Sequence, residues 1–188
     1  SENKKLDRVD LCLADERRVA AELKPGEVRI WTWVVGPSVI CGRNQDIPAE
    51  VDLDYCKANG IEVYRRHSGG GAVYADSGNI MLSYVTRSEE TVPEIFARWI
   101  RLLADALRQL GIDAQPTGRN DIEVDGRIVS GGAFYRTHDG ASIAHSTLLY
   151  DTNAAHMANA LTPPAEKLAR HGVVSVPARI GLLRDYTD

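Results

Sequence analysis

Residues 65–79 form a glycine-centred segment that constrains the fold more than any other part of the chain. The segment reads Arg-Arg-His-Ser-Gly-Gly-Gly-Ala-Val-Tyr-Ala-Asp-Ser-Gly-Asn. The three consecutive glycines expose backbone N–H groups, so a phosphate or carboxylate can approach the main chain. Apolar runs at 61–64, 72–74 and 80–85 are typical of strands. We therefore expect an anion-binding loop held between strands, whereas a bare glycine triplet would fit a flexible hairpin equally well.

Charged and polar residues flank the glycines. Arg65 and Arg66 add permanent positive charge and planar donor groups that suit phosphate or carboxylate. Asp76 and Asn79 could hold a metal ion or a polar part of a ligand. Neither the Gly-x-x-x-x-Gly-Lys-Ser/Thr phosphate loop nor a glycine run that opens a helix is present.

The remaining pattern predicts an α+β fold with a mixed, mostly antiparallel sheet. Helices are predicted over 9–23 and 93–110, the second one capped by Thr91 and ended by Gly111. A strand is predicted over 28–35, hairpin turns at 125–126 and 139–140, and short helices over 153–160 and 164–170. Strands joined by short turns favour antiparallel pairing.

Composition indicates one globular domain over residues 1–188. Hydrophobic residues make up 44% and charged residues 26% of the chain, which is ordinary for a packed domain. The net charge of −4 argues against a general nucleic-acid or membrane-surface binder. The polar N-terminus is not followed by an apolar run of signal-peptide length, so we expect a cytoplasmic protein.

Three cysteines, Cys12, Cys41 and Cys56, lack metal-type spacing, and their odd number does not suggest a disulfide framework. Buried packing is the expectation for each.

The segment 65–79 resembles the Arg-Arg-x-Ser-Gly-Gly-Gly-Ala-Val-(aromatic)-x-Asp-x-Gly-Asn motif of the lipoate-protein ligase A family. Segments 117–122, 126–133, 145–149 and 167–179 resemble further motifs of that family, in the same order. The resemblance implies the catalytic fold of biotin and lipoate ligases, related to class II aminoacyl-tRNA synthetases. Family members often carry a small C-terminal domain or use an accessory C-terminal subunit, and we expect that domain to be absent from residues 1–188.

The resemblance also implies ligands, partners and site residues. Lipoate, ATP and Mg²⁺ would give lipoyl-AMP, and the lipoyl group would pass to a lysine of a carrier domain, such as the 2-oxoacid dehydrogenase E2 component or the glycine cleavage H protein. Asp121 is the expected metal-binding and catalytic carboxylate. The residues expected around the acyl and nucleotide groups are Arg66, Ser68, Gly69, Gly70, Gly71, Ala72, Val73, Asn79, Asn120, Val129, Gly131, Ala133 and His145.

One position departs from the family pattern. The lysine that the family is expected to place beside the acyl carbonyl and the phosphate corresponds here to Ile128. Losing one preorganised electrostatic contact typically raises the barrier by about 3–4 kcal/mol. Arg127 is adjacent, but successive side chains of a strand point to opposite faces.

Ile128 leaves three functions open. The chain could be a lipoate-protein ligase with impaired activation, or a binding protein that has kept the pocket and lost the chemistry. It could also be an octanoyl or lipoyl transferase that uses a cysteine, for which Cys41 is the candidate nucleophile. Cys41 is the exception among the cysteines, because segment 39–45 resembles a strand and loop that lie next to the nucleotide in the lipoate-protein ligase A family, so its thiol could lie near the site.

Overall fold

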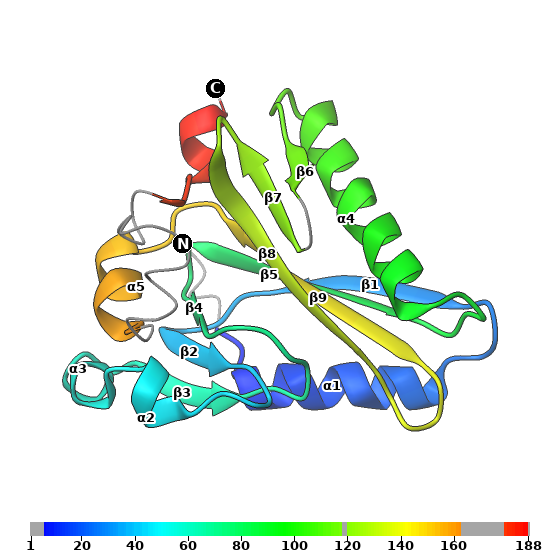
Figure 1. Cartoon of the computed structure of the whole chain (residues 1–188), viewed down its shortest axis with the longest axis horizontal. Helices are drawn as coiled ribbons and strands as arrows, with labels where there is room; N and C mark the ends of the chain where they lie inside the picture. The colour runs from blue at the N-terminus through cyan, green and yellow to red at the C-terminus, as the bar shows by residue number, and fades with distance from the viewer. Residues whose placement is uncertain (1–5, 118–119, 163–178, 188) are drawn as a thin grey trace.

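A computed structural model describes residues 6–117, 120–162 and 179–187. Its largest element is an antiparallel sheet of six strands (Figure 1). Across this sheet the order is β1 (Val28–Trp33), β5 (Asn79–Thr86), β9 (Ser142–Leu149), β8 (Arg127–Arg136), β7 (Asp121–Val124) and β6 (Gln115–Thr117). The central pair is β5 with β9, in a register that joins Asn79 to Leu149 and Thr86 to Ser142.

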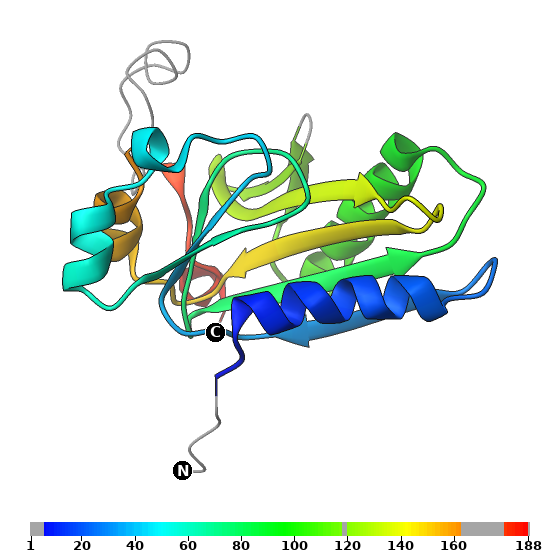
Figure 2. The same cartoon turned by 90° about the horizontal axis from the view of Figure 1, so that it is seen from below.

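Two helices cover opposite faces of this sheet (Figure 2). On β5, Tyr84 packs in a core cluster with helix α4 (Val92–Gln109), whereas Val85 packs in a cluster with Ala20 of helix α1 (Val9–Glu22). Because neighbouring side chains of a strand point to opposite faces, the two helices must lie on opposite sides. The α+β fold is thus confirmed.

A second, three-stranded sheet lies on the α1 side of the main sheet. Strand β2 (Ser38–Cys41) is its centre and pairs parallel with β3 (Glu62–Arg65) and antiparallel with β4 (Val73–Ala75). Short helices accompany it: α2 (Ile47–Glu50), α3 (Leu53–Ala58) and α5 (Ala154–Ala160). The 3-10 helix η1 (Leu183–Tyr186) packs instead in the core between the main sheet and α4. The glycine run 69–71 joins β3 to β4, so strands flank the glycine loop as predicted.

Local signals in the sequence fixed several element ends. A capping box between Thr91 and Glu94 begins α4, and Gly111 follows the helix with a φ of +84°. The apolar periodicity of residues 93–110 predicts a packing face that includes Ala106 and Leu110, and this is wrong in part, because both are exposed and Ile100 is buried instead. The helix predicted over 164–170 lies outside the described residues. Among the described helices, none is both long and apolar enough to span a membrane.

Candidate active site

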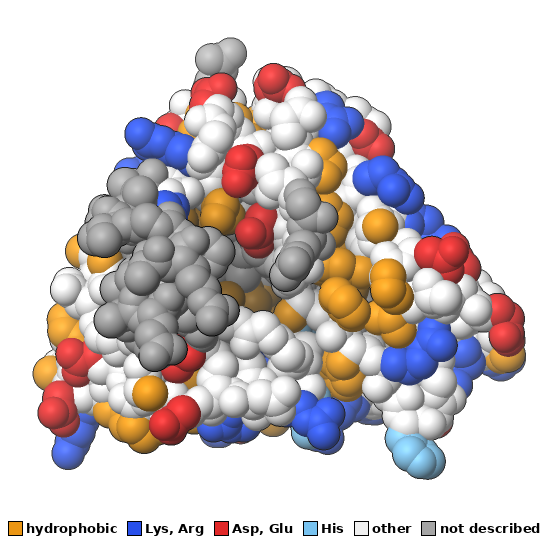
Figure 3. All heavy atoms as spheres, viewed as in Figure 1, with side chains coloured by type: hydrophobic (Ala, Val, Ile, Leu, Met, Phe, Trp, Pro, Cys, Tyr) orange, Lys and Arg blue, Asp and Glu red, His pale blue; other side chains and the backbone are white. Residues whose placement is uncertain are grey.

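Two adjoining cavities lie where the glycine loop faces the main sheet. The first has a volume of about 320 Å³ and the second about 300 Å³. Both are bordered by Gly71, Ala72, Val73, Asp121, Gly131 and Thr147. The space-filling view shows the face of the molecule that is seen in Figure 1. This face is hollowed near its middle, with hydrophobic side chains inside the hollow (Figure 3). The shared lining makes the cavities two parts of one trough.

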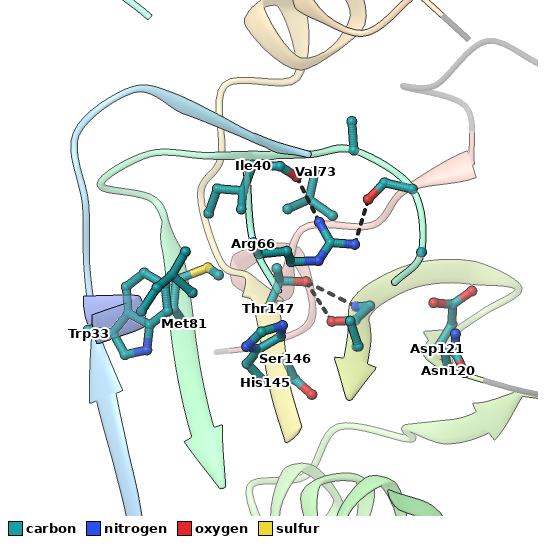
Figure 4. Close-up of a pocket in the computed structure, with 17 residues that line it drawn as sticks. Trp33, Ile40, Arg66, Val73, Met81, Asn120, Asp121, His145, Ser146 and Thr147 are labelled. Carbon is teal, nitrogen blue, oxygen red and sulfur yellow. Dashed lines mark hydrogen bonds between the residues drawn. The ribbon is translucent and has the colours of Figure 1, made fainter. Parts of the chain in front are cut away.

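The first cavity is apolar at one end and polar at the other. Figure 4 shows Trp33 and Met81 at one end and Asn120 and Asp121 at the opposite end. The Trp33 indole Nε1 donates to Ser83 Oγ at 2.8 Å, so the polar atom of the ring is already satisfied. The remaining lining residues are Leu13, Ile40, Arg66, Gly70, Gly132, Ala133, His145 and Ser146. Such a cavity suits an acyl chain that ends in a carboxyl group.

Arg66 shapes the glycine loop from inside. Arg66 is 5% exposed, and its guanidinium donates to Ser68 Oγ at 2.9 Å and to the carbonyl oxygens of Ile40, Gly69 and Gly71 at 2.8, 2.6 and 2.8 Å. Burial lowers its pKa to about 10, so it stays charged at neutral pH. Most of the Arg66 donors therefore bind protein oxygens, although their planar arrangement also suits a phosphate or carboxylate.

Arg65 likewise serves a loop rather than a ligand. It is exposed, and its Nη1 lies 2.8–3.0 Å from the carbonyl oxygens of Gly42, Arg43 and Gln45. The loop after β2 is thereby tied to β3.

Gly42 and the loop glycines 69–71 have different structural roles. A Cβ on Gly42 would lie 2.0 Å from the Gly70 carbonyl oxygen, and Gly70 itself has a φ of +90°. Close approach of two backbones thus requires glycine at 42, and the left-handed conformation favours it at 70. Gly70 and Gly71 border the first cavity, whereas Gly69 is exposed and borders neither cavity.

A buried polar chain supports the loop from below. Ser68 Oγ lies 2.7 Å from His145 Nε2, and His145 Nδ1 lies 3.1 Å from the carboxylate of Glu16 in α1. Glu16, 1% exposed, also accepts a 2.6 Å hydrogen bond from Ser83 Oγ. Of the Ser68–His145–Glu16 chain, only His145 borders either of the two cavities, and Ser68 supports the loop through its hydrogen bonds.

Sequence reasoning missed Glu16, although a signal was present. Val9, Leu13, Glu16 and Ala20 recur at steps of three or four residues, so a carboxylate stands in the apolar stripe of the helix. A charge in that position is rarely buried without a partner.

Two predicted binding residues lie elsewhere. Asn79 is fully buried, donates its amide to the Tyr74 carbonyl at 3.2 Å and borders neither cavity. Asp76, proposed beside it, accepts backbone N–H groups from Gly78 and Asn153 and serves a turn. These residues hold β4, β5 and α5 together.

A β-bulge explains why Val129 also fails as a site residue. Ile122 pairs with Ser130 and Glu123 with Ile128, so Val129 is an extra residue in β8. The bulge turns Val129 into the core beneath α4 and Ile128 toward the second cavity. Arg127 is exposed, in agreement with the prediction that it does not replace a lysine at 128.

Asp121 and Asn120 line the same trough as the glycine loop. Asp121 borders both cavities and Asn120 borders the first. Burial, and next the charge of Glu123, raise the pKa of Asp121, while Arg179 opposes the rise. No group of three or more His, Cys, Asp or Glu residues able to hold a metal occurs in the described part of the chain. A lone carboxylate still fits Mg²⁺ that keeps water and phosphate ligands.

Cys41 does not reach the site. Strand alternation sends Ile40 into the first cavity and Cys41, fully buried, into the core of the small sheet. Burial raises the pKa of the thiol despite the nearby arginines. A reactive cysteine needs exposure and a lowered pKa, so Cys41 is unsuited to attack a substrate.

Known proteins resemble the chain along nearly its whole length. The family profile "Lipoyl protein ligase A/B catalytic domain" matches residues 10–188. Lipoate-protein ligase LplJ of Bacillus subtilis is 35% identical over 187 residues, which cover 100% of this chain and 56% of that protein. The chain thus spans little more than half of that relative.

Solved structures agree in fold. The structure of a bi-partite lipoate protein ligase from Thermoplasma acidophilum, studied with its E2 lipoyl domain, has a TM-score of 0.84 and 31% identity. That match covers 95% of this chain and 71% of the other. A lipoate-protein ligase A bound with ATP has a TM-score of 0.84 and 28% identity, covering 96% of this chain and 74% of the other. With the glycine loop, the trough and the profile match in agreement, the chain belongs to the lipoyl protein ligase A/B catalytic domain family.

Proposed function

We propose that the chain is the catalytic part of an ATP-dependent lipoate-protein ligase. The observation that carries this proposal is the first cavity, whose apolar end and polar end match an acyl chain and its carboxylate. Trp33 and Met81 would meet the far end of the chain, and burial of that apolar surface would stabilise the complex. The relatives named as lipoate ligases support the same acyl group.

The chain's own residues would orient the carboxylate. The backbone at Gly70 and Gly71 would receive the anionic end, on a loop that the Arg66 hydrogen bonds hold rigid. Asp121 would hold Mg²⁺ where the two cavities meet. ATP, when bound, supplies the phosphate that activates the carboxylate, and the ATP-bound relative supports its use.

Transfer would then need an acceptor lysine on a lipoyl-carrier domain. The 2-oxoacid dehydrogenase E2 component and the glycine cleavage H protein are candidate carriers, and the E2 lipoyl domain studied with the archaeal ligase supports the first. That ligase is bi-partite, which makes an accessory C-terminal subunit a reasonable requirement for transfer here.

The two chemical steps should be measured separately. The protein is incubated with lipoate, ATP and Mg²⁺, and lipoyl-AMP is followed by mass spectrometry with and without ATP. Carrier modification is assayed in a second reaction supplied with lipoyl-AMP. ATP-dependent lipoyl-AMP is the expected product. Tight binding of lipoyl-AMP with neither step detectable would favour a pseudoenzyme instead.

Changing the depth of the first cavity at its apolar end tests whether the acyl chain lies there. Met81→Ala should extend the first cavity and move the preference toward longer fatty acids by about fourfold for each added CH₂, since each buried CH₂ contributes about 0.8 kcal/mol. Leu82→Ala is the matched control, because Leu82 is the next residue of β5 and packs on the α4 side. An equal change of preference in both variants would place the acyl chain elsewhere.

A further inference from the structure

Arg179 borders the second cavity beside Ile128. Ile180 forms a parallel bridge with Ile128, and the Gly181 N–H donates to the Ile128 carbonyl at 2.9 Å. Two backbone contacts therefore hold the segment that begins with Arg179 against the strand position that the family resemblance assigns to a lysine.

Arg179 also has an unused donor. Its Nε is buried and has no hydrogen-bond partner within the described part of the chain. Buried N–H groups are nearly always paired, so this atom calls for an acceptor that the protein does not provide. An anionic ligand oxygen in the second cavity would provide one.

Among the described residues, the other cations near the trough already bind protein oxygens or are exposed. Arg66 already donates to four protein oxygens, and Arg127 is exposed. Of the lysines in the described ranges, Lys24 and Lys57, neither borders a cavity. Glu50 and Asp121 also line the second cavity. Of its lining residues that the structure describes, Arg179 is the one with a positive charge.

We propose that Arg179 contacts the junction between the acyl carboxylate and the α-phosphate, and supplies the positive charge that Ile128 cannot. The inference rests on the proposed ligase function. A guanidinium can donate two parallel hydrogen bonds to a phosphate, which a lysine cannot do.

The chemical step balances without a proton from the arginine. A carboxylate oxygen of lipoate attacks the α-phosphorus of ATP and forms the acyl–phosphate bond. The bond from the α-phosphorus to the oxygen that bridges to the β-phosphate breaks, and pyrophosphate leaves with that electron pair. Arg179 stays protonated and stabilises the charge that gathers on the α-phosphate oxygens.

Four variants test this role. Arg179→Ala should weaken binding of lipoyl-AMP by about tenfold or more and slow its formation by about 10²–10³-fold. Arg179→Lys should keep part of both, and Arg179→Gln should keep neither. Ile128→Lys in the Arg179→Ala background should restore lipoyl-AMP formation, because it returns a cation to the same cavity.

Arg127→Ala is the matched control, since Arg127 adjoins Ile128 in β8 but is exposed. It should bind lipoyl-AMP like the parent. Circular dichroism and melting of each ligand-free variant check the fold, and if Arg179→Ala does not fold, the Lys and Gln variants replace it.

The outcomes separate the two proposals. If the parent forms lipoyl-AMP and Arg179→Ala forms and binds it equally well, the role of Arg179 is overturned and the ligase function stands. Equal binding by the Lys and Gln variants also overturns it, because charge would then not matter. If the parent binds lipoyl-AMP without forming it, binding by these variants still decides the role of Arg179. A parent that neither forms nor binds lipoyl-AMP overturns the ligase function and, with it, the inference.

Discussion

Glu16 is a buried carboxylate whose partners come from two different strands. It accepts from Ser83 in β5 and faces His145 in β9, and so ties α1 to the middle of the main sheet. His145 in turn meets Ser68 below the glycine loop. A side chain far from the glycine motif thus helps to fix the loop.

Removing the Glu16 carboxylate should destabilise the fold. Glu16→Ala leaves the Ser83 hydroxyl and the His145 ring without their buried acceptor, at a cost of about 1–3 kcal/mol for each unsatisfied group. Glu22→Ala on the same helix is the control, because Glu22 pairs with Arg18 in the open and should matter by less than about 1 kcal/mol. Urea unfolding measures both, and equal midpoints would show that the buried chain adds nothing to stability.

At the residue scale, residue types were easier to predict than the direction of their hydrogen bonds. The motif implied site roles for Arg66 and His145, and both border the first cavity. Whether a guanidinium points at a ligand or at backbone carbonyls depends on where distant segments of the chain lie in the fold. Arg66, for example, donates to the carbonyl of Ile40 in β2. Glu16 could have been found from its place in the apolar stripe of α1.

Among the elements, the glycine loop and the end of β2 depend on each other. Gly42 and Gly70 approach so closely that only hydrogen fits between their backbones. The loop shape therefore requires a glycine outside the loop itself.

Gly42→Ala should be far more harmful than Gly69→Ala. The first substitution places a methyl group 2.0 Å from a backbone oxygen, whereas a Cβ on Gly69 meets nothing within 4 Å. We expect Gly42→Ala to cost at least about 2 kcal/mol, in the range of overpacked sites, and to weaken lipoyl-AMP binding. Gly69→Ala should cost less than about 1 kcal/mol. Comparable melting temperatures for the two variants would contradict this close contact.

The elements themselves were largely predictable, and their register was not. Helix periodicity, the Thr91 cap and the Asp125–Gly126 turn are local signals, and the structure confirms them, with φ values of +50° and +72° in the turn. The bulge at Val129 is set by how β8 pairs with β7. No local sequence pattern predicts that extra residue. The family resemblance therefore implied site roles for both Val129 and Ile128.

For the whole molecule, burial of weakly acidic groups predicts loss of stability in alkali. Burial is the largest cause that raises the pKa of Cys12, Tyr64 and Tyr135 to about 12, from ordinary values of 9.0 for the thiol and 10.0 for the phenols. Between these values the unfolded chain releases protons that the folded chain keeps. The contribution of these three groups to stability is therefore constant below about pH 9 and is lost as the pH rises toward 12.

Urea midpoints measured from pH 7 to 11 should show this fall, and Tyr135→Phe should reduce its slope. A midpoint that stays level up to pH 11 would mean that these groups titrate alike in the folded and unfolded chains.

Strand β9 occupies the middle of the main sheet and is the last of its six strands to be synthesised. During synthesis β5 can pair with β1 on one edge. Its other edge stays unpaired until β9 has left the ribosome. This unpaired edge of β5 contains the apolar run 80–82 and can form hydrogen bonds with a strand of another nascent chain. The order of synthesis thus makes the interval before residue 149 emerges the period when the nascent protein most needs a chaperone.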